Sequence, residues 1–250
     1  MTRIIAIANH KGGVGKTTSV ACIGQALSRY GLRTLLVDLD AQANLSGIFL
    51  KEEAAATLFD YLSGRAEALP IIAISERLHL LPSSLQLARA EVDLAGRIAR
   101  ERIIADLLEP IAGQYDYILI DCPPSLGLLT MNALVAASEL YVPLTAEALP
   151  LKGLAMLEDI AAQLRRAYNS GLEISGIIVT RYNNRKLNKA VLSSIKQRYG
   201  AKVFSTMIRE NITIAEAPLY GGDLFSYAPN SYGAQDYKRL TEEIINRLNK

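Results

Sequence analysis

The sequence predicts an α/β protein with a doubly wound, mostly parallel β-sheet flanked by helices. Short apolar runs of strand length alternate with longer stretches whose apolar residues recur at helical spacing. Continuous apolar runs suit strands that are buried between two layers of helices, and their alternation with helices is typical of βαβ units. A glycine-rich loop directly follows the first run. In such sheets ligands bind beyond the carboxyl ends of the strands.

The predicted elements follow one another without a break. Helical spacing predicts helices over residues 17–31 and 151–168, an amphipathic helical tract over 87–108 and a last helix over 236–250. No repeat, low-complexity tract or Pro/Gly/Ser-rich linker interrupts the series, so we expect one domain over residues 1–250. The predicted strands are residues 3–8, 34–39, 78–82, 115–121, 139–144, 174–180 and 202–206.

The composition is that of a globular protein. Half of the 250 residues are hydrophobic and 21% are charged, which allows a sizeable core. The first residues lack the apolar length of a signal peptide, and no apolar run reaches the roughly 18 residues of a membrane span. Cys22 and Cys122 lie far apart and are too few to hold an iron–sulfur cluster, so we expect reduced thiols in a cytoplasmic protein.

The segment NHKGGVGKTT, residues 9–18, ends like a phosphate-binding P-loop and lies between a strand and a helix. In such a loop Lys16 would neutralise the β- and γ-phosphates and the Thr17 hydroxyl would bind Mg²⁺. One position departs from the general pattern, because the first glycine is replaced by His10 and a second lysine, Lys11, follows. Two lysines do not easily share one phosphate face, so Lys11 could reach outward to a nucleotide on another subunit.

Carboxylates follow two further predicted strands. Asp38 and Asp40 come at the end of the strand 34–39, where they could hold Mg²⁺, position a water or simply form an acidic loop. Asp121 ends the strand 115–121, which is the Walker B arrangement in which an aspartate reaches Mg²⁺ through a water.

These segments resemble the deviant Walker A loop, the first switch segment and the Walker B strand of the ParA/MinD family of ATPases. The resemblance implies slow, partner-stimulated ATP hydrolysis with ATP/ADP and Mg²⁺ as cofactors. It also implies an ATP-bound homodimer, in which Lys11 crosses the interface to the partner's phosphates and Asp40 orients the attacking water. Asp38 would lie near the metal or support the loop. The matching residues are KGGVGKTT (11–18), VDLDAQAN (37–44) and YILIDCPPSLG (117–127).

The resemblance also implies a set of site residues. Catalysis would rest on Lys11, Lys16 and Asp40, and metal binding on Thr17, Asp40 and Asp121. A C-terminal segment passes the adenine in relatives, and Asn211 is its candidate contact, with Arg209 in place of a usual proline. The nucleotide-binding residues are Lys11, Gly12, Gly13, Val14, Gly15, Lys16, Thr17, Thr18 and Asn211.

Eight basic residues and no acidic one lie between Arg181 and Arg209. Such a run can be a solvated helix face or a surface for DNA phosphates. The resemblance extends to VTRYNNRKLN (179–188), in which Arg185 matches an arginine that touches DNA in Soj relatives. In IRENITIAEAP (208–218), however, Glu210 and Thr213 replace family arginines, which weakens the DNA hypothesis. The candidate contacts for sequence-independent DNA binding are Arg185, Lys186, Lys189 and Arg209.

Three functions remain open at this stage. The resemblance implies a nucleoid-associated partition ATPase with a ParB-like adaptor, or a close variant that positions protein cargo. A MinD-like membrane switch needs a C-terminal amphipathic helix. The end of the chain, with Ile244, Ile245 and Leu248 on one face, lacks an aromatic-rich, Lys-flanked tail, so we expect no stable membrane association. The third possible function is that of a nucleotide-dependent regulator without catalysis. The intact set of motif lysines and aspartates argues against this function.

Overall fold

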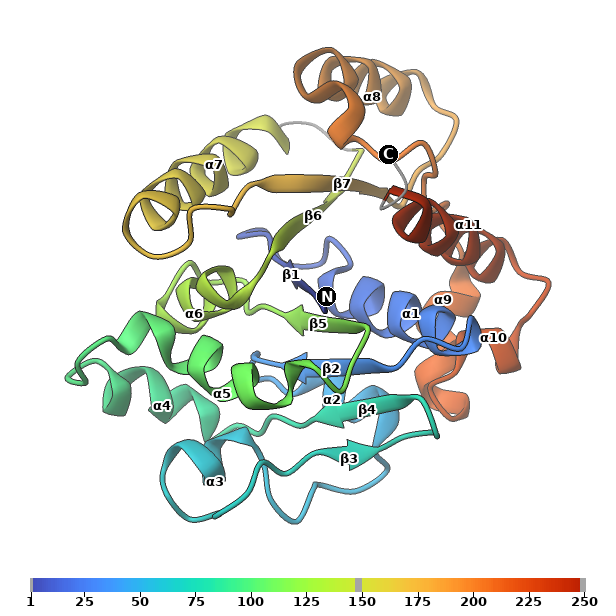
Figure 1. Ribbon diagram of the computed structural model, residues 1–250. Coiled ribbons are helices and arrows are strands. Elements are labelled where there is room, and N and C mark those ends of the chain that lie inside the picture. The colour runs from blue at the N-terminus through green and yellow to red at the C-terminus, as the bar shows by residue number, and fades with distance from the viewer. Residues whose placement is uncertain (1, 147–149, 248–250) are drawn as a thin grey trace.

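The computed structural model describes residues 2–146 and 150–247, with helices on both faces of one seven-stranded sheet (Figure 1). The strand order is β3-β4-β2-β5-β1-β6-β7, and every neighbouring pair is parallel except β3 and β4. This confirms the predicted fold class. The strands are β1 (Arg3–Ile7), β2 (Thr34–Asp38), β3 (Ile72–Ala73), β4 (Leu78–Leu81), β5 (Tyr117–Asp121), β6 (Glu139–Thr145) and β7 (Ile174–Thr180).

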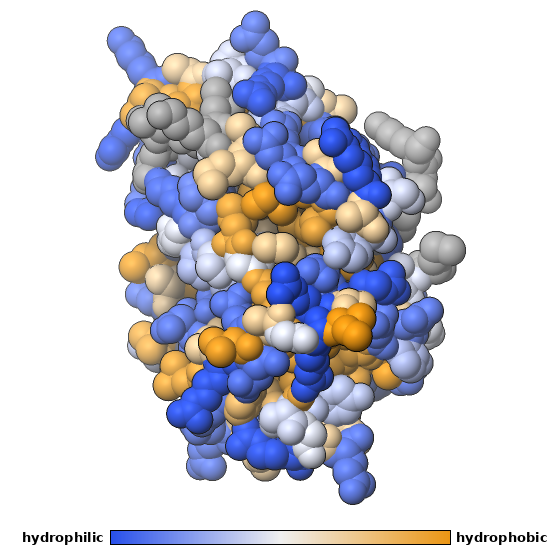
Figure 2. Space-filling model, turned by 90° about the vertical axis from the view of Figure 1, so that its left-hand side faces the viewer, coloured by the Kyte–Doolittle hydropathy of each residue, from blue (hydrophilic) through white to orange (hydrophobic). Residues whose placement is uncertain are grey.

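Two layers of helices cover the sheet and bury two separate cores. The first layer is α3 (Leu58–Leu62), α4 (Leu87–Leu94), α5 (Ile103–Ala112), α6 (Leu128–Ala136), α7 (Pro150–Ala167) and α8 (Lys186–Tyr199). The second is α1 (Lys16–Arg29), α2 (Asn44–Phe49), α9 (Ile212–Glu216), α10 (Leu224–Tyr227) and α11 (Tyr232–Asn246). On the side of the molecule seen in Figure 2, hydrophobic residues lie in patches bordered by hydrophilic ones.

The carboxyl ends of β1, β5 and β2 meet in the middle of the sheet. Ile7 is in register with Asp121, and Asp121 with Asp38, so the last residues of three adjacent strands lie side by side. Along β1, Ile5 and Ile7 face the core under α1, whereas Ala6 faces the opposite core. The loops that leave these strands therefore start from one edge and can build one site.

The predicted strand 202–206 is wrong. Residues Gly200–Lys202 form a short 3₁₀ helix, η2, and only Val203 makes a β-bridge, to Ile177. Phe204 is buried instead, with its ring 5.2 Å from the Tyr141 ring in an edge contact. A Cβ at Gly176 would lie 2.5 Å from the Phe204 ring, so a glycine in β7 makes room for it. Burial of this aromatic ring replaces continuation of the strand ladder.

The helical tract 87–108 is divided into two helices. α4 ends at Leu94 and α5 begins at Ile103, after the 3₁₀ turn η1 (Arg100–Arg102). Ala99 between them has a left-handed φ of 54°, which a right-handed helix cannot include. The two-residue strand β3 was not anticipated, because two residues are too few to show a strand period. None of the described helices is long and apolar enough to cross a membrane.

Candidate functional site

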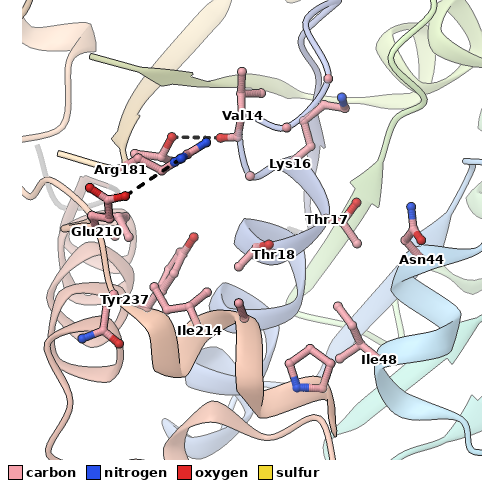
Figure 3. A pocket seen from close by; sticks show the side chains of 18 of the residues that line it. Val14, Lys16, Thr17, Thr18, Asn44, Ile48, Arg181, Glu210, Ile214 and Tyr237 are labelled. Atoms are coloured by element: carbon pink, nitrogen blue, oxygen red, sulfur yellow. Dashed lines mark hydrogen bonds and ion pairs between the residues drawn. The ribbon is translucent and has the colours of Figure 1, made fainter. Parts of the chain in front are cut away.

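The loop between β1 and α1 is shaped for phosphate. Gly13 and Gly15 have φ angles of 73° and 86°, a left-handed conformation that favours glycine. Gly15 is also the residue before α1, so the first N–H groups of that helix point into the loop. Two side chains fix the loop from outside. Asn9 donates from Nδ2 to the Pro143 carbonyl at 2.7 Å. The Thr180 hydroxyl donates to the carbonyl of Val14, which is labelled in Figure 3, at 2.9 Å.

Lys16 begins α1 and is buried beneath this loop. Burial lowers the pKa of the Lys16 ammonium, and the negative charges of Asp121 and Asp40 oppose that shift. Thr17 and Thr18 follow it on the first turn of the helix and line the same cavity (Figure 3). The ammonium thus lies among carboxylates, where anionic phosphates would find a localised positive charge.

Asp121 stands out among the carboxylates of residues 2–146 and 150–247. It is fully buried, and neither carboxylate oxygen has a hydrogen-bond partner among the described residues. Burial raises the pKa of Asp121 well above its usual value, and the charge of Asp38 adds to that effect, while the positive charge of Lys16 opposes it. Unpaired buried carboxylate oxygens are costly unless a cation or water satisfies them, so this site fits a hydrated Mg²⁺.

The two aspartates at the end of β2, Asp38 and Asp40, have different surroundings. Both oxygens of Asp38 are occupied: Oδ1 accepts from Asp40 N at 3.1 Å, and Oδ2 accepts from the Ser46 N–H and hydroxyl at 2.8 Å each. Asp38 is therefore placed to support the loop, and its pKa is raised to about 6 by burial. Asp40 accepts from Gln42 N through Oδ1 and lines the cavity. Of the two, Asp40 is better placed to act on a bound nucleotide.

Two serines that the sequence analysis missed hold this loop in place. The Ser46 hydroxyl accepts from Ser83 N at 2.9 Å, and the Ser83 hydroxyl donates to the Asp40 carbonyl at 2.8 Å. Ser83 lies in the loop after β4, so β4 and β2 are connected through this network. Single serines carry no motif signal, and only the three-dimensional structure reveals their roles.

A cavity of about 1160 Å³ opens above the P-loop. One end is polar, with the P-loop and Asp40, and the other is apolar, with Ile48 of α2, Ile214 of α9 and Pro218 (Figure 3). This gradient suits a ligand that has phosphates at one end and a flat ring at the other. Asn211 lines the apolar end, but its Oδ1 already accepts from Thr213 N at 3.0 Å as the cap of α9. Only its amide NH₂ can face a base.

Lys11 is exposed at the tip of the loop, in contrast to the buried Lys16. Its backbone N–H donates to Asn9 Oδ1 at 3.1 Å, which orients the turn. The ring of the preceding His10 lies against Gly153 of α7, where a Cβ would come within 2.1 Å of it. The two lysines of the loop therefore have different surroundings, because Lys11 is exposed to solvent and Lys16 is buried.

The structure divides the eight basic residues of the 181–209 run. Four have acidic partners: Arg181 with Glu210 at 3.9 Å, Arg198 with Glu158 at 3.0 Å, Lys202 with Glu173 at 2.9 Å and Arg209 with Asp236 at 2.7 Å. The other four, Arg185, Lys186, Lys189 and Lys196, are exposed and have no ion-pair partner among the described residues. The candidate DNA contact Arg209 thus differs from the other three, because its charge is already compensated.

Known proteins share both this sequence and this fold. A family model described as an AAA domain matches residues 2–174. The chromosome-partitioning ATPase Soj of Treponema pallidum is 39% identical over 251 residues, which cover 99% of this chain and 98% of Soj. The chromosome partitioning protein ParA of Caulobacter vibrioides is 38% identical over 98% of this chain and 94% of ParA. The chain belongs to the ParA/Soj family.

Solved structures agree with the ParA/Soj assignment. The septum site-determining protein MinD of Pyrococcus horikoshii, solved with Mg-ADP, is 30% identical, has a TM-score of 0.81 and covers 99% of this chain and 98% of MinD. Cobyrinic acid a,c-diamide synthase of Mycobacterium smegmatis, solved with ADP and magnesium, is 32% identical with a TM-score of 0.87 over 100% of this chain and 96% of that protein. This chain, as a member of the ParA/Soj family, is therefore a P-loop ATPase. The predicted resemblance to this family is confirmed.

Proposed function

We propose that this chain is a ParA-type partition ATPase, which binds DNA non-specifically as an ATP-bound dimer and acts with a ParB-like adaptor at the nucleoid. The observation that carries the proposal is the joint presence of an exposed Lys11 beside a buried Lys16 and a set of uncompensated cations on α8. The two lysines support nucleotide-dependent dimerisation, and the cations support binding to DNA phosphates.

ATP and Mg²⁺ fit the residues of the site. The P-loop N–H groups and Lys16 would bind the phosphates, and Thr17 with Asp121 would hold Mg²⁺, which neutralises charge on the transferred phosphoryl group. The unpaired oxygens of Asp121 support this assignment, because they lack any partner among the described residues. Asp40 would orient the attacking water, and the apolar end of the cavity would receive the adenine, with Asn211 at its edge.

Pairing would make catalysis conditional. Lys11 would reach the phosphates held by a second subunit and add positive charge there, as an arginine finger does. A monomer would lack that charge, so hydrolysis would be slow until two subunits close and an adaptor steadies them. The cargo, whether a plasmid, a chromosome or a protein cluster, would be chosen by the adaptor.

DNA binding would use a narrower surface than the whole basic run. Lys186, Lys189 and Lys196 are spaced along α8 so that they lie on one side of it, and Arg185 precedes its first turn. These four cations, which have no ion-pair partner in the part of the chain that the structure describes, could neutralise up to eight phosphates on two subunits. The logarithm of the DNA affinity would then fall with the logarithm of salt with a slope of up to about −7.

A membrane-switch function is less well supported. The apolar residues of α11, including Tyr237, Leu240 and Ile244, are buried against the α1 side of the sheet, so this helix cannot also lie in a lipid surface without leaving the core. Leu248 lies outside the described residues.

The test is DNA binding by the Asp40→Ala protein with ATP or ADP at two salt concentrations. We expect binding with ATP only, and weaker binding at higher salt. Lys189→Ala and Lys196→Ala should each weaken it, whereas Arg198→Ala, on the same helix but paired with Glu158, should weaken it less. Equal losses from all three substitutions, or no DNA binding with any nucleotide, would contradict the DNA part of the proposal.

A further inference from the structure

The segment that runs from the loop after β4 into α4 contacts residues near both Asp40 and Asp121. At its beginning, the loop after β4 holds the Asp40 carbonyl through the Ser83 hydroxyl, at 2.8 Å. Further along, Glu91 reaches across to the start of α6, which follows Asp121 by way of residues 122–127. α4 and α6 lie on the same side of the sheet (Figure 1). One continuous segment, from Ser83 to Glu91, therefore contacts the loop after β2 and the start of the helix that follows β5.

The contact of Glu91 with α6 replaces a cap that α6 does not supply itself. The residue before α6 is Gly127, which has no side chain, and the first turn of α6 contains no acidic residue. Glu91 Oε1 accepts from Leu129 N at 3.2 Å, which satisfies one of the N–H groups left open at a helix start. Its negative charge also lies at the positive end of the α6 dipole.

The contact with Glu91, and not the backbone conformation, explains why position 127 is a glycine. Its φ of −83° is accessible to any residue, so conformational freedom does not explain a glycine here. A Cβ at this position, however, would lie 2.5 Å from Glu91 Oε1 and 3.3 Å from Glu91 Cδ. The glycine leaves the space that the carboxylate occupies.

We propose that Glu91 is a positioning residue for the loop 122–127 and, through that loop, for Asp121. The loop has its two ends fixed, one by β5 and the other by Glu91, and Pro124 within it lines the nucleotide cavity. Ser83, four residues before α4, holds the backbone carbonyl of Asp40, so the segment from Ser83 to Glu91 supports the loops of both carboxylates. The inference rests on the proposed ATPase site and adds a residue that touches neither nucleotide nor metal.

The test compares Glu91→Ala with Glu91→Gln and with Asp93→Ala, an exposed acidic residue on the same helix. We expect Glu91→Ala to lower kcat by about tenfold, because small displacements of catalytic groups are costly, with a KM for Mg-ATP within about twofold of wild type. Glu91→Gln keeps an acceptor oxygen and should restore kcat to within about twofold of wild type. Asp93→Ala should be unchanged. A normal kcat in Glu91→Ala, or no rescue by glutamine, would overturn the proposal.

A second variant reaches the same contact from the other side and covers the case in which Glu91→Ala does not fold. Gly127→Ala should displace the carboxylate and lower kcat in the same way. In the Glu91→Ala background, the alanine at 127 has nothing to displace and should add no further loss. If the loss of kcat in the double variant equalled the product of the losses in the two single variants, the proposal would be overturned. A normal kcat in Gly127→Ala would also overturn it.

Amide hydrogen exchange separates this inference from the proposed function. Exchange at Leu129 in the protein without nucleotide should be faster in Glu91→Ala than in wild type, whatever the enzymatic activity. A wild-type protein without ATPase activity would contradict the proposed catalysis alone. Unchanged exchange at Leu129 would contradict the role of Glu91 alone.

Discussion

Arg209 and Asp236 form a two-bond ion pair beside the nucleotide cavity. Arg209 donates from Nε and Nη2 to the two carboxylate oxygens at 2.8 and 2.7 Å, and its backbone N–H donates to the same carboxylate at 3.0 Å. The guanidinium also lies 3.9 Å from the centre of the Tyr232 ring. Asp236 is 3% exposed, so the pair ties the segment before α9 to α11.

This pair predicts that Arg209 stabilises the fold more than it binds DNA. Arg209→Ala would leave the buried Asp236 carboxylate without its counter-charge and with only the backbone N–H of residue 209 as a donor, which should lower the free energy of unfolding by about 1–3 kcal/mol. DNA affinity measured at a temperature where the variant is folded should change little. Chemical denaturation and DNA titration of the same preparation would measure both quantities.

Arg185→Ala is the matched control for that prediction. Its side chain is exposed and has no ion-pair partner among the described residues, so its removal should leave the free energy of unfolding within about 0.5 kcal/mol of wild type. DNA affinity should fall instead. A stable Arg209→Ala protein with weakened DNA binding would show that the Asp236 pair opens when DNA is bound.

The central part of the site was predictable from sequence because it is built from local signals. A strand, a glycine loop and a helix start are consecutive in the chain, and Asp38 and Asp121 each end an apolar run. Parallel register then places those strand ends together without further information. The positions of Lys16, Thr17 and Asp40 around the cavity follow from these short-range rules.

The supporting contacts were not predictable, because they join residues that are far apart in sequence. Ser83 contacts Asp40, Glu91 contacts Leu129, and Arg209 pairs with Asp236, and none of these pairs forms a motif. For the same reason, the sequence does not show which residues of the basic run 181–209 have acidic partners, because those partners lie outside the run. Phe204 was assigned to a strand because strand preference and aromatic burial produce the same apolar signal.

The two lysines of the P-loop should have separable effects. Lys16→Ala should weaken ATP binding by at least about tenfold, since in the proposed function the buried ammonium would be the localised positive charge at the phosphates. Lys11→Ala should bind ATP as a monomer with nearly normal affinity and fail to dimerise. Fluorescent-nucleotide titration gives the first quantity, and light scattering with ATP gives the second. An Lys11→Ala protein that dimerises normally with ATP would refute the role of Lys11.

Removal of Asp40 should separate binding from hydrolysis. Asp40→Ala should bind Mg-ATP normally and lower kcat by about 10²-fold or more, as expected when a water-orienting carboxylate is lost. The backbone carbonyl of Asp40, which accepts from Ser83, remains in the variant, so the loop should stay in place. Steady-state phosphate release and nucleotide titration would test this. A loss of ATP affinity equal to the loss of kcat would instead indicate a collapsed loop.

Asp121→Asn should stabilise the protein in the absence of nucleotide and Mg²⁺, and do so in a pH-dependent way. Burial raises the pKa of Asp121 well above its usual value and that of Asp38 to about 6, so the folded state holds these protons at a pH at which the unfolded chain has released them. The contribution of these two carboxyl groups to the free energy of unfolding is therefore greatest below the unfolded pKa of about 4 and falls as the pH rises through the raised folded values. Asparagine removes the charge, so the Tm of the variant should exceed that of wild type by about 3 °C or more at pH 8, and by less at pH 5.

Mg²⁺-dependent ATP hydrolysis should be lost in the same Asp121→Asn variant. Asp93→Asn, at an exposed position, should shift Tm at neither pH, and a pH-independent Tm difference for Asp121→Asn would mean that Asp121 is already ionised in the folded protein.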